Sequence, residues 1–472
     1  MTLKKFNYLL ISILICIFEI GLSGTVRGKE IVEMKHKSKH TIFLIHGIGG
    51  NKKHFGKMDK ALKSVLNGKN EDVEYSIVNV EYDTGNDNKT PYDFAKDINT
   101  IIQKTTASGL FQKQDKISLI MHSQGGLVGS IWLFQSMQST PGYATPKIIT
   151  HVDSFITLAT PFWGAKTAQW GSEIKSLAKR LGTDLPLPFG QKELEQMSFG
   201  SDMIYDFRQA MINPEFKPII DYLKKNIRFL NIVGVADVLN PLGIFISGSK
   251  KYEDDGAVPL SSARFDFLYL KSLKDQYEQG DRVLLKENKS IEMSPYIVVN
   301  ALHRSPVPDL KNFASIVQVT KDCINNKYCG HPSFKYIVDH LQGKKVRQRD
   351  EKLGDFKTFL IDINVQLPKN LKFKKEDVKI EFFKLDGGSL KDSNIEISHA
   401  LELNSEGKRF SDDEPHHLRA YYMGSIKRFL PHRENAILLK ISMEGLRSRF
   451  IEVKLKESYS TFIEVNLINK TI

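Results

Sequence analysis

The chain has 472 residues and a formal net charge of +12, with 41% hydrophobic and 26% charged residues. This length indicates two or three domains, and the composition is that of a globular protein, which excludes a disordered or fibrous chain. The basic residues are scattered without the aromatic-interleaved basic motif of a nucleic-acid-binding surface, so we expect no nucleic-acid partner. A charge of this size could attract a membrane or lipid surface, but we prefer the alternative, an ordinary lysine-rich surface in contact with water.

The first 23 residues have the layout of a secretory signal peptide. Lys4 and Lys5 precede an apolar run over residues 8–18, and residues 21–23 are small enough for a cleavage site. The run is too short for a membrane span and is followed by Glu19. We therefore expect residues 1–23 to be removed and the protein to be secreted, periplasmic or at the cell surface.

Two strand-like runs each end in a glycine-rich segment. Residues 41–45 precede His-Gly-Ile-Gly-Gly at 46–50, and residues 117–121 precede His-Ser-Gln-Gly-Gly at 122–126. A tight strand-to-helix turn exposes a serine as a nucleophile, and a glycine-rich loop after a strand can direct a backbone N–H at an oxyanion. The usual turn is Gly-x-Ser-x-Gly, and Met121 stands where the first glycine is expected.

Together the two motifs resemble those of the α/β-hydrolase superfamily, and within it the secreted bacterial lipases and esterases. The resemblance extends over roughly residues 40–343. It implies that Ser123 is the nucleophile and that the N–H groups of Ile48 and Gln124 bind the oxyanion. It implies no organic cofactor. Some similar lipases hold a calcium ion near the acid loop, but no residue here identifies a metal site.

Strand and helix patterns alternate through the first two thirds of the chain, which predicts a mostly parallel sheet with helices on both faces. Because ligands in such sheets bind at the carboxyl ends of the strands, both glycine motifs are expected at one rim. The expected elements are strands at 73–82, 116–122, 150–160, 227–236 and 296–302 and a helix at 91–105.

Residues 163–226 interrupt this alternation with helical stretches and several aromatic residues. The segment begins in Thr-Pro-Phe-Trp-Gly at 160–164, which is similar to a turn of lipase-like hydrolases. We expect a lid and an acyl-chain pocket here, with Phe162 and Trp163 as substrate-binding residues. An ordinary helical insertion is the alternative.

The α/β-hydrolase order places the acid after the serine and the histidine last. Asp255 lies in an Asp-Gly-Ala-Val loop similar to the acid loop of secreted lipases and is preferred, while Asp237, directly after a strand, is the alternative. For the base, His303 ends the last strand-like run and can reach the rim. His331 precedes a proline at a helix start and is the alternative.

The remaining chain reads as a linker at 344–354 and a β-rich domain at 355–472, after a catalytic domain at 24–343. Apolar and polar residues alternate at 378–382, 437–441, 451–455 and 463–467, which predicts a small antiparallel sandwich. After cleavage of the signal peptide only Cys323 and Cys329 remain, and in an oxidising compartment we expect a disulfide between them.

These features predict an exported carboxylic ester hydrolase, a lipase or lipid esterase with a Ser123–His303–Asp255 triad and an acyl-enzyme intermediate. Two alternatives stay open. The same triad would serve an acyltransferase or thioesterase, and the scaffold could belong to a binding or adhesion protein without turnover, because fold alone does not prove function.

Overall fold

The computed structural model describes residues 37–469, except 68–71, 108–111, 166–167, 169–188, 236–252, 272–281, 284–287, 305–313, 347–355, 369–376, 402–415 and 427–434. The expected signal peptide at 1–23 lies outside the described residues. Within the described segments, no helix combines the length and apolar character needed to cross a bilayer.

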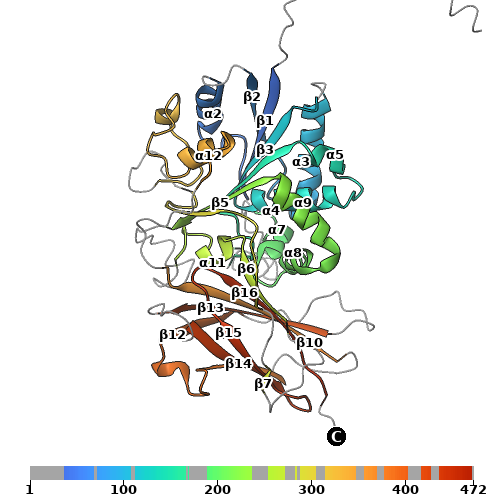
Figure 1. The fold of residues 1–472 in the computed structure, drawn as a ribbon, viewed down its shortest axis with the longest axis vertical. Helices are drawn as coiled ribbons and strands as arrows, with labels where there is room; N and C mark the ends of the chain where they lie inside the picture. The colour runs from blue at the N-terminus through green and yellow to red at the C-terminus, as the bar shows by residue number, and fades with distance from the viewer. Residues whose placement is uncertain are drawn as a thin grey trace, which may run out of the picture. The chain divides into compact units, whose positions relative to one another are not determined.

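Six strands form the central sheet, in the order β2-β1-β3-β4-β5-β9 (Figure 1). Every neighbouring pair is parallel. The strands are β1 (Ser38–Ile45), β2 (Val73–Val80), β3 (Lys116–His122), β4 (Val152–Leu158), β5 (Arg228–Val235) and β9 (Tyr296–Asn300). The mostly parallel sheet predicted from the sequence is therefore confirmed. Because β1 and β3 are neighbours, the segments that follow them lie at one rim of the sheet.

Helices cover both faces of this sheet because successive strand residues point to opposite faces. In β1, Ile42 and Leu44 join the core beneath two helices, whereas Phe43 and Ile45 join the core beneath the helices of the other face. The first face is covered by α2 (Met58–Asn67) and α12 (Phe334–Leu341), and the second by α3 (Pro91–Ala107), α4 (Gln124–Met137) and α5 (Pro146–Ile149).

The segment predicted as a lid is helical where the structure describes it. It contains α7 (Gln191–Met197), α8 (Asp202–Ile212), the short helix η1 (Pro214–Phe216) and α9 (Lys217–Asn226). Ser201 caps α8 by accepting a hydrogen bond from the N–H of Ile204. Met203 and Ile204 of α8 are buried in the same core as α3 and α4, so this part of the segment packs on the central sheet.

Two further sheets form the C-terminal sandwich. One has the order β12-β13-β10-β16-β6-β8 and the other β11-β14-β15-β7, and their inner faces share one apolar core. The strands beyond residue 355 are β10 (Thr358–Leu367), β11 (Val378–Phe383), β12 (Ile395–Leu401), β13 (His416–Ile426), β14 (Ala436–Met443), β15 (Arg449–Lys454) and β16 (Ser460–Asn466). The alternation of apolar and polar residues in the sequence thus predicted strands correctly. Among them, β16 is paired in parallel with both β10 and β6.

Three strands from the middle of the chain complete these two sheets. They are β6 (Phe267–Lys271), β7 (Arg282–Val283) and β8 (Asn288–Ile291), and they precede β9 of the hydrolase sheet. Residues 38–472 accordingly form one compact unit. The sandwich is therefore connected to the part of the chain that forms the central sheet by the pairing of β6, β7 and β8 as well as by the chain that leads into β10.

A buried ion pair joins α8 to the sandwich. The Arg208 guanidinium lies 2.7 Å from the Asp362 carboxylate of β10, and both side chains are almost fully buried. The guanidinium also lies 4.1 Å from the centre of the Trp163 ring. Burial lowers the pKa of Arg208, whereas burial raises the pKa of Asp362 to about 6 against the opposing effect of the guanidinium.

Cys323 and Cys329 form a disulfide, which confirms the predicted pair. Cys323 is buried in the core beneath α2 and α12, at the end of the short helix η2 (Lys321–Cys323). A loop this short restricts the unfolded chain by only about 2 kcal/mol. Its local effect is to fix the segment that leads into α12.

Candidate active site

Ser123 occupies the turn between β3 and α4 with a backbone conformation that few non-glycine residues adopt. Its φ is 53° and its ψ is −127°. Such a conformation costs on the order of 1–3 kcal/mol and is characteristic of functional sites. The turn is held by a hydrogen bond from the Ser123 N–H to the carbonyl oxygen of Leu158 at the end of β4. The strained turn agrees with the nucleophile elbow that the sequence predicts.

Met121, the departure from the usual elbow pattern, is accommodated by a glycine on α4. Its side chain is fully buried. A methyl group on Gly129 would lie only 2.1 Å from the Met121 sulfur, so α4 can pack on this side chain only because residue 129 has none. The elbow therefore keeps its close helix–strand packing with the small residue moved from the strand to the helix.

The loop after β1 lies against the serine. A methyl group on Gly47 would be 2.7 Å from the Cβ atom of Ser123, so the two segments are in direct contact. Ile48 follows Gly47 in this loop, and Gln124 is the first residue of α4, where a backbone N–H has no acceptor within the helix. The positive end of a helix dipole also favours an anion at this position. Both predicted oxyanion donors thus lie in segments adjoining Ser123.

His303 and Asp255 are hydrogen-bonded to each other. The Nδ1 atom of His303 lies 2.8 Å from Oδ2 of Asp255, and the His303 N–H also donates to the Asp255 carbonyl oxygen over 2.8 Å. The other carboxylate oxygen, Oδ1, accepts from the N–H groups of Ala257 and Val258. The Asp255 side chain is 1% exposed. This arrangement fixes the imidazole and leaves its Nε2 atom for proton transfer.

Two buried histidines, His54 and His122, connect the loop of His303 to the serine turn. The Nε2 atom of His122 is 3.0 Å from the carbonyl oxygen of His303, and its Nδ1 atom is 2.8 Å from Nε2 of His54. Because a carbonyl only accepts, His122 carries its proton on Nε2, and the bond between the two rings must therefore be donated by His54. Burial lowers the pKa of His54 to about 3 and that of His122 well below its ordinary value, so both rings are neutral.

His46 and Tyr82 support the loop after β1. The His46 Nδ1 atom donates to the carbonyl oxygen of Gly47 over 2.9 Å, and the ring stacks on Tyr82 with centroids 4.4 Å apart. The Tyr82 hydroxyl donates to the carbonyl oxygen of His46 over 2.6 Å. These contacts give His46 a structural role. Sequence patterns did not single out His54, Tyr82 or Glu193, which belong to no motif.

The alternative acid and base have different outcomes. Asp237 lies outside the described residues. His331 is described, and its Nε2 atom lies 3.2 Å from the carbonyl oxygen of Gln318, with its Nδ1 atom near Ser333. Burial lowers the pKa of His331 to about 4. Its partners are backbone and hydroxyl groups, whereas the mechanism needs a carboxylate to orient the base.

Phe162 and Trp163 are buried in an aromatic cluster. Neither side chain has exposed surface. The Phe162 ring stacks on Phe265 at 4.2 Å, and the Trp163 indole donates to the carbonyl oxygen of Arg264 over 2.7 Å. Contact of either residue with a substrate stays a prediction.

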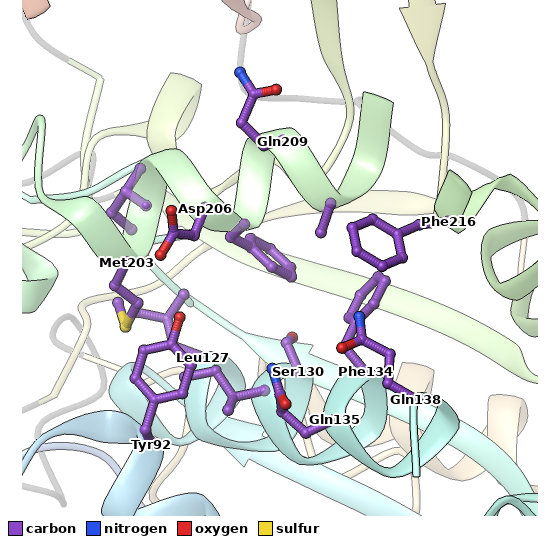
Figure 2. A pocket seen from close by; sticks show the side chains of 14 residues that line it. Tyr92, Leu127, Ser130, Phe134, Gln135, Gln138, Met203, Asp206, Gln209 and Phe216 are labelled. Atoms are coloured by element: carbon purple, nitrogen blue, oxygen red, sulfur yellow. The ribbon is translucent and has the colours of Figure 1, made fainter. Parts of the chain in front are cut away.

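An apolar groove runs between α4 and α8 (Figure 2). Its volume is about 320 Å³. The α4 residues that line it recur at helical spacing, so they form one stripe, and the stripe begins one turn after Ser123. The lining residues are Tyr92, Leu127, Ser130, Ile131, Phe134, Gln135, Gln138, Met203, Ile204, Asp206, Phe207, Gln209, Ala210 and Phe216.

Comparison with known proteins agrees with this geometry. Residues 35–183 match a family described as "Putative serine esterase (DUF676)". The structure is similar to phospholipase PlaB from Legionella pneumophila, with 13% identity and a TM-score of 0.60 over 91% of this chain and 93% of that chain. This chain has an α/β-hydrolase fold, similar to that of lipases and esterases. The PlaB complex with thio-NAD matches this chain with the same identity and coverage and a TM-score of 0.63.

A lipase from another bacterium matches a smaller share of this chain. The mature form of lipase BlEst2 from Bacillus licheniformis is 18% identical over 48% of this chain and 79% of that chain, with a TM-score of 0.33. No curated protein sequence matches this chain. Across the segments that the structure describes, no three His, Cys, Asp or Glu side chains gather as ligands for a metal ion.

Proposed function

We propose that this α/β-hydrolase is an exported serine carboxylester hydrolase that acts on lipid esters. The observation that carries the proposal is the His303–Asp255 hydrogen bond of 2.8 Å in a loop that is fastened to the strained turn of Ser123 through His122. A nucleophile, a base oriented by a buried carboxylate and two candidate oxyanion donors are the parts that acyl transfer requires.

In the proposed reaction the Ser123 hydroxyl attacks the ester carbonyl while Nε2 of His303 takes its proton. The imidazolium is stabilised by Asp255 and returns the proton to the leaving alcohol. The oxyanion of the tetrahedral intermediate is bound by the N–H groups of Ile48 and Gln124. Water then attacks the acyl-enzyme with His303 again as the base, which releases the acid and restores the serine.

The groove between α4 and α8 is the proposed site for the acyl chain. The side of the groove formed by α4 begins at Leu127, one helical turn beyond the nucleophile, is mainly apolar as far as Phe134, and ends at Gln138, directly after the helix. These residues span roughly 16 Å along α4 at 1.5 Å per residue. A groove of this length and lining favours a long alkyl chain over an acetyl group.

Two finer parts of the proposal rest on other observations. The layout of residues 1–23 supports export, and the net charge of +12 supports attraction to an anionic lipid surface. The similarity in fold to a phospholipase makes phospholipid esters a substrate class to include in the assay.

The experiment is fluorophosphonate labelling of the wild-type protein and of Ser123→Ala, followed by turnover of p-nitrophenyl esters of increasing chain length and of a phospholipid. Ser123→Ala should lose labelling and about 10⁴- to 10⁶-fold of turnover. Undiminished hydrolysis by a folded Ser123→Ala protein would sink the triad.

Two other results would point to the alternative functions. A wild-type protein that is labelled but transfers acyl groups to an alcohol in preference to water is an acyltransferase, and one that prefers thioesters is a thioesterase. A folded wild-type protein with neither labelling nor turnover would be a binding protein.

A further inference from the structure

Glu193 of α7 is a fully buried carboxylate that the catalytic mechanism does not use. It is 0% exposed and lies far along the chain from both glycine motifs. Four hydrogen-bond donors converge on its two oxygens. They belong to Gly190, Gly85, Thr84 and Gln124.

One donor is the side chain of the residue after the nucleophile. Gln124 Nε2 lies 3.1 Å from Oε2 of Glu193. Because a carboxylate only accepts, this contact fixes which end of the Gln124 amide faces Glu193. Gln124 supplies one of the two proposed oxyanion donors from its backbone, so Glu193 holds the first residue of α4 by its side chain.

A second donor connects Glu193 to the loop of the other oxyanion donor. The Thr84 hydroxyl lies 3.1 Å from Oε2 of Glu193, and the Gly49 N–H donates to the same hydroxyl over 3.1 Å. A hydroxyl that accepts from Gly49 has its single proton free to donate, so the direction of both bonds is determined. Gly49 adjoins Ile48, whose N–H is the other proposed oxyanion donor.

Helix capping accounts for only part of these contacts. The Gly190 N–H donates to Oε1 over 2.5 Å, which is the capping contact at the start of α7. That contact leaves Oε2 for Gln124 and Thr84. Burial raises the pKa of Glu193, and the hydrogen bonds from Gly190, Gln124, Gly85 and Thr84 offset this effect only in part.

We infer that Glu193 is a positioning residue that holds both halves of the oxyanion hole in register, through Gln124 on one side and Thr84 on the other. Donors that are fixed before the reaction stabilise the oxyanion without reorganisation, and an unfixed donor loses part of this effect. The inference rests on the proposed esterase function. It also implies that α7, which lies in the segment predicted as a lid, belongs to the part of the site that does not move.

The sharpest test is Thr84→Val, because it cuts the link to Gly49 and leaves the α7 cap and Gln124 in place. We expect kcat for a short p-nitrophenyl ester to fall about 10-fold or more, below the 10²- to 10³-fold loss of a whole oxyanion donor. KM should stay within twofold. Phenylboronic acid, which forms a tetrahedral serine adduct, should bind more weakly by the same factor as kcat/KM falls.

Two variants separate positioning from stability. Thr84→Ser restores the hydroxyl and should restore kcat and boronate affinity. Thr106→Val removes a buried threonine hydroxyl that bonds to carbonyl oxygens of α3, away from the site, and should lower the melting temperature without changing kcat. Glu193→Gln places an amide among four donors and should lower kcat at least as much as Thr84→Val.

The inference is overturned if Thr84→Val and folded Glu193→Gln keep kcat and boronate affinity within twofold of the wild type while turnover still depends on Ser123. Should Glu193→Gln not fold, the two Thr84 variants decide by themselves. A wild-type protein that neither hydrolyses esters nor reacts with fluorophosphonate overturns the proposed function and this inference together.

Discussion

His122 donates a hydrogen bond from Nε2 to the carbonyl oxygen of His303 over 3.0 Å. The residue before the proposed nucleophile therefore holds the backbone of the loop that carries the proposed base. The carbonyl oxygen only accepts, so His122 carries its proton on Nε2. His54 stabilises this tautomer by donating a hydrogen bond to Nδ1 of His122. Two neutral, buried imidazoles thus connect the end of β3 with the loop after β9.

His122→Phe should lower kcat by about 10- to 100-fold with little change in KM, because a small displacement of the base loop misaligns the reacting groups. His122→Gln, whose amide can still donate near the Nε2 position, should recover part of the loss. Steady-state kinetics on a short ester measures both. Equal activity of His122→Phe and the wild type would show that the loop is held by the Asp255 contacts alone.

His303→Ala should cost as much turnover as Ser123→Ala, and the double variant should be hardly worse than either, because the triad acts as one unit. His331→Ala should keep most of its activity, since His331 contacts the Gln318 carbonyl oxygen. The check is kcat/KM for all four variants on one ester. A reversed order of the two histidine variants would contradict the assignment of the base.

Ala210→Phe should narrow the groove between α4 and α8. We expect kcat/KM for p-nitrophenyl dodecanoate to fall about 10-fold or more, with the acetate ester unaffected, because burial of each methylene contributes about 0.8 kcal/mol. Lys225→Phe adds the same ring at an exposed position of α9, outside the groove, and should leave the chain-length profile unchanged. A parallel loss with both esters would indicate general damage and argue against an acyl-chain site.

Arg208→Met should destabilise the fold by about 3–5 kcal/mol, because it leaves the Asp362 carboxylate buried without its partner. Replacing both, as Arg208→Met with Asp362→Leu, should recover most of that loss. Denaturant unfolding of the two single variants and the double variant gives the coupling between the residues. Additive losses would mean that the ion pair contributes nothing specific between α8 and β10.

The pH dependence of stability should reflect His40, whose pKa is lowered to about 4. Burial is the main cause, opposed by Asp153 and assisted by Lys116 and Arg228. The unfolded chain takes up a proton near pH 6.5 and the folded chain only near pH 4. The contribution of His40 to stability is thus complete above pH 6.5 and is lost as the pH falls towards 4, by up to about 3 kcal/mol.

His40→Gln keeps a polar partner for the Ser118 hydroxyl, which lies 2.7 Å from the His40 ring, but does not titrate. Urea unfolding at about pH 7 and about pH 4.5 should show a smaller loss for this variant than for the wild type. An equal loss in both proteins would mean that other groups account for the acid sensitivity.

The sequence predicted best those elements in which a glycine-rich turn directly follows a strand. The runs before residues 46–50 and 122–126 predicted two parallel strands with glycine turns at one rim, and β1 and β3 are those strands. The preference for His303 came from its place after a strand-like run, whereas that for Asp255 came from the resemblance of its loop to the acid loop of secreted lipases. The two side chains are hydrogen-bonded. Their catalytic roles, with those of Ser123, Ile48 and Gln124, stay predictions.

The contacts that position these residues depended on tertiary structure. Met121 conflicts with the local pattern, and its space comes from Gly129, eight residues later on the next helix. The strands β6 to β8 precede the last hydrolase strand, yet they pair with strands of the C-terminal sandwich. His54 and Glu193 belong to no motif. Each reaches the site from another segment of the chain, so its role depends on proximity in the folded structure, which no sequence spacing encodes.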